Sequence, residues 1–105
     1  MTIQFNTDKN IASNDRTANY LSSIVSDSLE RFSEHVTRIE VHLSDENGSG
    51  KTGGDDKRCV LEARMEGKKP VAVTNDADTI EKAVRGAIDK LTTMLEKSLD
   101  RQRSY

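Results

Sequence analysis

The chain has 105 residues, which is the common size of one domain with a single modest core, and 33% of them are hydrophobic and 32% charged. It contains neither an apolar run of about 20 residues, which a membrane-spanning helix needs, nor the basic start and apolar stretch of a secretory signal. A soluble cytoplasmic protein is expected, and a formal net charge of -2 argues against one that coats nucleic acid through bulk positive charge.

Hydrophobic periodicity predicts a strand, a helix and a second strand in the N-terminal part. Residues 2–7 alternate in polarity and place Ile3 and Phe5 on one face of a strand. A helix is expected over residues 15–34, after capping oxygens at positions 13–15. Its apolar stripe consists of Leu21, Val25, Leu29, Phe32 and Val36, widened by Tyr20 and Ile24. A strand at 37–43 follows, with Ile39, Val41 and Leu43 inward and Arg38, Glu40 and His42 outward.

The C-terminal part predicts two more strands and a long helix. Residues 57–66 alternate again, and the inward set is Cys59, Leu61, Ala63 and Met65. A turn at 67–70 leads to a strand at 70–74, because proline fixes φ and glycine relaxes it. The helix is expected over residues 79–101, with Asp78 and Glu81 resembling a capping box. Its apolar stripe consists of Ile80, Val84, Ala87, Ile88, Leu91, Leu95 and Leu99.

The order β-α-β-β-β-α predicts one α+β domain over residues 1–105. A right-handed crossover makes the first and second strands parallel, and short turns make the remaining strands an antiparallel meander. Both helices must cover the same sheet face, because only one face of each strand is apolar. The expected architecture is a two-layer sandwich whose other sheet face is open and polar.

The glycine-rich segment 47–54 reads NGSGKTGG and contains the Gly-Lys-Thr of a nucleotide-binding loop. A loop of that type requires a further glycine five residues before Gly50, where Asp45 stands, and a helix after the threonine. Here an alternating strand follows, and nearby carboxylates would repel a phosphate. We therefore predict a flexible hairpin loop, and keep nucleotide binding at this segment only as an alternative.

No pattern of catalytic or metal-binding residues is evident. His35 and His42 have no nearby serine, cysteine or paired carboxylate that would suggest a triad, and Cys59, the only cysteine, falls on an inward position. A disulfide within the chain and a thiolate metal cluster are excluded. We predict a protein that is not an enzyme and that has no cofactor, metal or small-molecule substrate.

Basic residues are the remaining candidates for a binding site. Lys90, Lys97 and Arg101 are spaced by seven and then four along one flank of the last helix, and Lys82 and Arg85 lie on its more exposed side. Arg38, Arg58 and Arg64 share the open sheet face. The alternative is that all of these are solubilising charges interleaved with Glu40, Glu62 and Glu66.

Several segments together resemble the family of ribosome hibernation promoting factors and ribosome-associated inhibitors, also called ribosomal subunit interface or sigma-54 modulation proteins. They read TRIEVHLSDEN, DKRCVLEAR, PVAVT and AVRGAIDKLTTMLEKSLDRQ. The resemblance implies a β-α-β-β-β-α sandwich, similar in outline to double-stranded-RNA-binding domains. Lys90 matches a family lysine, and Lys97 and Arg101 match basic positions further along the helix, whereas Thr93 and Leu99 stand where relatives often carry further basic residues.

The resemblance also implies a function. Family members bind the small ribosomal subunit, with its 16S-type rRNA and ribosomal proteins, where messenger and transfer RNA would lie. They block translation and preserve idle ribosomes under stress or in stationary phase, by steric occlusion and not by catalysis. Because the chain ends at Tyr105, a short-type member is expected, with a monomer favoured. The alternative is a protein-interaction module of the same fold that no longer binds the ribosome.

Overall fold

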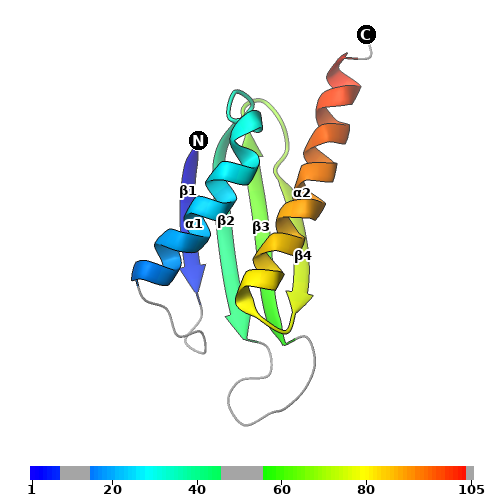
Figure 1. Cartoon of the computed structure of the whole chain (residues 1–105). Helices are drawn as coiled ribbons and strands as arrows, with labels where there is room; N and C mark the ends of the chain where they lie inside the picture. Colours follow the sequence, from blue (N-terminus) through cyan, green and yellow to red (C-terminus); the bar gives the residue numbers. More distant parts are fainter. Residues whose placement is uncertain (8–14, 46–55, 104–105) are drawn as a thin grey trace.

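The computed structural model describes residues 1–7, 15–45 and 56–103, and of residues 15 and 100–103 the backbone alone. The elements are β1 (Thr2–Thr7), α1 (Asp15–Leu29), the short 3-10 helix η1 (Glu30–Phe32), β2 (Val36–Asp45), β3 (Lys57–Met65), β4 (Val71–Ala77) and α2 (Ile80–Arg103). Both long helices pack on the same face of the sheet, with α2 over β3 and β4 (Figure 1). The predicted α+β sandwich is confirmed.

The sheet has the predicted mixed topology, with the strands in the order β1-β2-β3-β4. β1 is parallel to β2, whereas β2, β3 and β4 are antiparallel neighbours. The register aligns the inward residues of all strands in rows across the sheet. One row is Ile3, Ile39, Ala63 and Val71, and the next is Phe5, Val41, Leu61 and Val73. The apolar face of the sheet is therefore continuous from one edge to the other.

The core lies between these rows and the two helices. Leu21, Val25 and Leu29 of α1 are buried, as are Leu91 and Leu95 of α2. Burial of this apolar surface is the main stabilising contribution to the fold. Cys59 is part of the same core, fully buried, and burial raises the pKa of its thiol to about 12. The interpretation of Cys59 as a small buried hydrophobe is confirmed.

Some predicted boundaries were wrong. The first helix ends at Leu29 and tightens into η1, so Val36, which we placed on the helical stripe, is instead the first residue of β2. Tyr20 does not widen the buried stripe, because its exposed fraction is 51%. β4 extends to Ala77, beyond the predicted end at residue 74. The capping oxygens proposed at positions 13–15 lie outside the described side chains.

The start of α2 is capped by Thr79, one residue later than predicted. Its Oγ1 accepts a hydrogen bond from the backbone N–H of Lys82 at 3.1 Å, which satisfies one free donor of the first turn. The predicted box of Asp78 and Glu81 does not form, because their carboxylates instead contact Lys82 and Arg85. Thr79 thus fixes where α2 begins and hence the position of every side chain along it.

Gly86 lets α2 approach β4 closely. Asn75 of β4 stands opposite the inward residue Cys59 of β3, so its side chain faces the helices. Its Nδ2 donates to the carbonyl oxygens of Lys82 and Ala83 at 3.5 and 3.2 Å. A Cβ at position 86 would overlap with this amide, coming within 2.7 Å of its Cγ. A side chain at this position would therefore compete with Asn75 for the space between helix and strand.

An ion pair on the helix layer joins η1 to α2. Arg31 Nη2 lies 2.8 Å from Glu96 Oε1, and both side chains are more than half exposed. Because water and salt screen such pairs, we expect Glu96→Gln to lower the free energy of unfolding by less than about 1 kcal/mol. Urea unfolding of the two proteins measures the difference, and a larger loss would show that the pair fixes the helix packing.

Candidate nucleic-acid interface

The open sheet face carries its arginines in a network with carboxylates. Arg64 Nε lies 3.2 Å from Glu40 Oε2, and its Nη2 lies 3.2 Å from Glu62. Arg38 Nε approaches the same Glu40 oxygen to 3.5 Å, although the geometry is not that of a hydrogen bond. His42 Nε2 lies 3.5 Å from the other Glu40 oxygen. Glu40, only 15% exposed, is thus the centre of the network.

The third arginine of this face is held in the same way. Arg58 Nε donates to Asp76 Oδ1 at 2.9 Å, from β3 to the directly opposite residue of β4. The hydrogen bond lowers the pKa of Asp76 below its ordinary value, with a weaker contribution from the charge of Lys90. The described arginines of the face are therefore matched by carboxylates: Arg38, Arg58 and Arg64 against Glu40, Glu62 and Asp76. This arrangement favours a neutral, solvated face over a phosphate-binding one.

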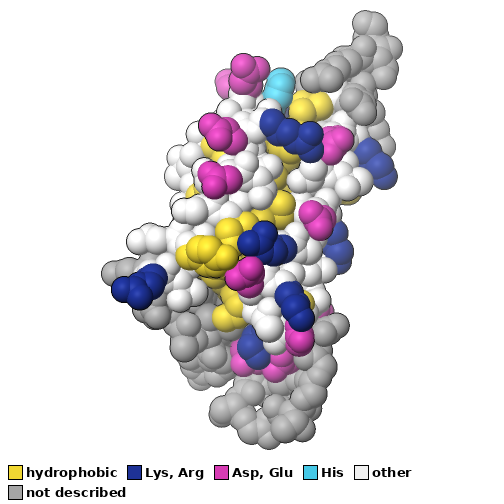
Figure 2. All heavy atoms as spheres, viewed as in Figure 1, with side chains coloured by type: hydrophobic (Ala, Val, Ile, Leu, Met, Phe, Trp, Pro, Cys, Tyr) yellow, Lys and Arg dark blue, Asp and Glu magenta, His cyan; other side chains and the backbone are white. Residues whose placement is uncertain are grey.

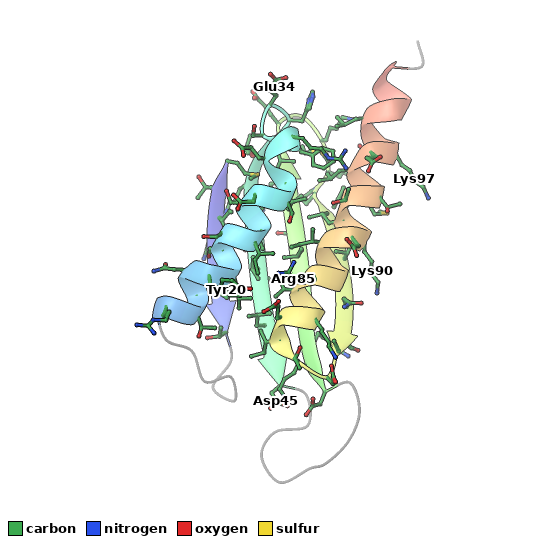
Figure 3. The ribbon with its side chains drawn as sticks, in the orientation of Figure 1. Tyr20, Glu34, Asp45, Arg85, Lys90 and Lys97 are labelled. Atoms are coloured by element: carbon green, nitrogen blue, oxygen red, sulfur yellow. The ribbon has the colours of Figure 1, made fainter. Side chains whose placement is uncertain are left out.

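The first turns of α2 carry two more matched cations. Lys82 Nζ lies 3.2 Å from Asp78, and Arg85 Nε lies 3.0 Å from Glu81, each at the i,i+4 spacing. The hydrogen bond with Glu81, and a weaker one with Tyr20 of α1, raise the pKa of the Arg85 guanidinium. Figure 3 shows Tyr20 and Arg85 between the two helices. Arg85 of α2 therefore interacts with both helices of the layer, through Glu81 of α2 and Tyr20 of α1.

Lys90 and Lys97 differ from these cations because neither has a carboxylate partner among the described residues. Lys90 Nζ donates to the uncharged backbone oxygen of Thr74 in β4 at 2.8 Å, and its charge acts on Asp76 only weakly. Lys97 makes no hydrogen bond or ion pair within the described part of the chain. Both point to the same side of α2 (Figure 3). The side chain of Arg101 lies outside the described residues.

Lys68 and Lys69, which the sequence analysis did not single out, extend this set. They lie in the turn before β4, separated from its first residue by Pro70, and neither has an ion pair within the described residues. Among the described basic side chains, those without a carboxylate partner are Lys68, Lys69, Lys90, Lys97 and, apart from them at the start of α1, Arg16. Cations without an ion pair among the described residues therefore lie in the turn before β4, where Lys68 shares a pocket with Glu34 and Glu66, and on the flank of α2 from which Lys90 reaches β4. We refer to Lys68, Lys69, Lys90 and Lys97 as the lysine edge.

The helix face itself shows no continuous basic area. In Figure 2, basic and acidic side chains alternate over both helices, with hydrophobic side chains visible between them. Contact with an extended phosphate backbone over the middle of this face would bring acids as well as bases against it. The lysine edge, at the side of α2 that faces β4, is the better candidate for a phosphate contact.

The base of the β2–β3 hairpin is acidic. Lys57 Nζ lies 3.0 Å from Asp56 and 3.4 Å from Asp45, and the hydrogen bond with Asp56 raises the pKa of the lysine. Residues 47–54 lie outside the described residues, but the element that follows them is the strand β3 and not a helix. The second requirement of a phosphate-binding loop is therefore not met.

Two further types of site find no support in the described residues. No group of histidines, cysteines or carboxylates in them is arranged to hold a metal ion. None of the helices formed by these residues is both long and apolar enough to cross a membrane.

Comparison with known proteins identifies the family. The family model described as "Sigma 54 modulation protein / S30EA ribosomal protein" matches residues 5–103. The chain belongs to this family. The resemblance seen in the sequence is therefore confirmed, and the match runs from within β1 to the end of α2. No curated protein sequence matches the chain.

Solved structures support the fold of this S30EA-type chain. It is similar to the N-terminal domain of Protein Y from Thermus thermophilus, with a TM-score of 0.70 and 21% identity, over 92% of this chain and 98% of that one. It is also similar to a ribosomal subunit interface protein from Coxiella burnetii, with a TM-score of 0.70 and 16% identity, over 95% of this chain and 99% of that one. At such identities the likeness shows a common fold.

Proposed function

We propose that this protein binds the small ribosomal subunit at the place where messenger and transfer RNA would lie, and that it inhibits translation or preserves idle ribosomes. Membership of the S30EA family and the likeness to a ribosomal subunit interface protein support ribosome binding. Occlusion of this kind needs no catalytic group. The expected mode of action is steric.

The observation that carries the proposal is the lysine edge. Ammonium groups that have no carboxylate partner among the described residues can meet phosphate oxygens without first breaking one of the ion pairs seen here, and each such contact releases counterions from the RNA. Contacts of this kind recognise the geometry of the backbone more than its base sequence. We therefore place Lys90 and Lys97 against ribosomal RNA, with a smaller contribution from the matched residues Lys82 and Arg85.

Co-sedimentation with purified small ribosomal subunits at near-physiological salt tests the function. We expect the protein to pellet with the subunits, and to be released when the subunits are loaded beforehand with messenger RNA and transfer RNA. Binding that is indifferent to this loading would contradict occupancy of the channel. If the protein stays in the supernatant at every salt concentration, ribosome binding itself is wrong.

A further inference from the structure

A groove runs between the free edge of the sheet and the last helix. Its lining consists of Val73 and Thr74 of β4 together with Lys90, Thr93 and Met94 of α2, and its volume is about 450 Å³. Met94 is 45% exposed, which is unusual for a large apolar side chain in this protein. The groove thus combines apolar walls with one cationic group, Lys90.

The floor of this groove is an edge strand with unused hydrogen-bonding capacity. β4 pairs with β3 on one side only, so its other side presents backbone N–H and C=O groups that no strand satisfies. The ammonium of Lys90 reaches the carbonyl oxygen of Thr74, in the middle of β4, at 2.8 Å. It occupies the place that the N–H of an added strand would take. A segment that pairs with β4 would displace this contact and leave the lysine free for a new partner.

The charges around the groove indicate which partner fits. Lys68 and Lys69 lie in the turn before β4, and Lys97 lies two helical turns beyond Lys90 on the same flank. None of these lysines has an ion pair with a described carboxylate. The nearest described acid of the strand, Asp76, already accepts from Arg58. Charge complementarity therefore favours an acidic segment in extended conformation.

A second copy of this chain fits less well. If two β4 strands paired antiparallel about Thr74, the two Lys90 ammonium groups would meet at the centre of the interface. The Lys97 flanks would also approach the same interface. Like charges brought together in this way oppose association.

We propose that the β4 edge binds an extended acidic segment of a partner protein as an additional strand, with apolar side chains against Val73 and Met94 and carboxylates near Lys90 and Lys97. This mode of recognition derives its affinity from main-chain hydrogen bonds and its selectivity from alternate side chains. The site is independent of whether the protein binds ribosomes, although both ligands would use the same lysines.

A synthetic peptide of alternating glutamate and valine, seven residues long with blocked ends, is a suitable probe. Titration into the isotope-labelled protein should shift the backbone amide signals of Val71–Ala77 and of the α2 residues that line the groove. The control peptide has the same sequence with N-methyl groups on alternate amides, which removes the pairing donors and keeps the charge. We expect it to bind at least about tenfold more weakly, because several backbone hydrogen bonds are lost.

Charge reversal provides the matched protein variants. Lys97→Glu should weaken peptide binding about threefold to tenfold, whereas Arg16→Glu, an equal change at an exposed cation of α1 that has no ion pair among the described residues, should stay within about twofold. Three results would overturn the proposal: equal binding of the N-methylated peptide, amide shifts confined to other strands, or shifts produced by a single-stranded oligouridine and not by the peptide. A dimer through β4 in sedimentation analysis would also reject it, in favour of a second copy.

Discussion

Replacing Lys90 and Lys97 together by alanine is expected to weaken binding to small ribosomal subunits about 25- to 60-fold at about 0.1 M salt. The figure follows if each lysine meets one phosphate, because each lost contact removes about 0.7 to 0.9 from the slope of log affinity against log salt concentration. The double variant should therefore also show a slope smaller by about 1.4 to 1.8. Co-sedimentation over a series of salt concentrations measures both quantities.

The matched control is the pair Lys82→Ala and Arg85→Ala. It lies on the same helix and removes the same charge, but each of these cations already has a carboxylate partner within about one turn. We expect a loss of less than about fivefold, because the remaining effect on distant phosphates is screened beyond about 8 Å at physiological ionic strength. Equal losses for the two pairs would mean that net charge, and not the lysine edge, determines affinity. Thermal unfolding of Lys90→Ala checks that losing the bond to Thr74 leaves the fold intact.

The fold could be predicted from the sequence because periodicity decides which face of each element is apolar. Residues such as Ile39 and Leu61 make one face of the sheet apolar. Covering that face with both helices buries it, and the elements from β1 to α2 have this arrangement. The wrong predictions fall at element boundaries, where the hydrophobic spacing of one element continues into the next. Val36 continues the helical spacing of α1 but begins a strand, because η1 and the turn after it end the helix first.

The candidate binding site was less predictable, because whether each cation has a carboxylate partner depends on strand register. Arg58 stands opposite Asp76, and Arg38 stands opposite Arg64 with Glu40 between them, relations that the spacing within one strand does not reveal. The pairs of Lys82 and Arg85 could have been recognised from their i,i+4 spacing. Of the eight candidates, only Lys90 and Lys97, on one flank of α2, have described side chains without an ion pair to another described residue.

Because Asn75 contacts Gly86, we expect Gly86→Ala to destabilise the native protein but to stabilise a variant that lacks the Asn75 amide. In the native sequence, Gly86→Ala gains about 1 kcal/mol of helix propensity. It also displaces the Asn75 amide and removes its bonds to the carbonyls of Lys82 and Ala83, at about 1 kcal/mol each, with further strain from the overlap. We expect a net loss of about 1 to 2 kcal/mol in the free energy of unfolding.

In an Asn75→Ala background, the alanine at position 86 has no amide to overlap with. Only the gain in helix propensity of about 1 kcal/mol then remains, so the double variant should be more stable than Asn75→Ala alone. A double-mutant cycle in urea should thus give a coupling of about 2 to 3 kcal/mol. No coupling would mean that Asn75 moves aside freely and that the close approach of α2 to β4 does not depend on glycine. A coupling of this size would show that one glycine sets the distance between β4 and α2, and with it the width of the groove and the reach of Lys90 to Thr74.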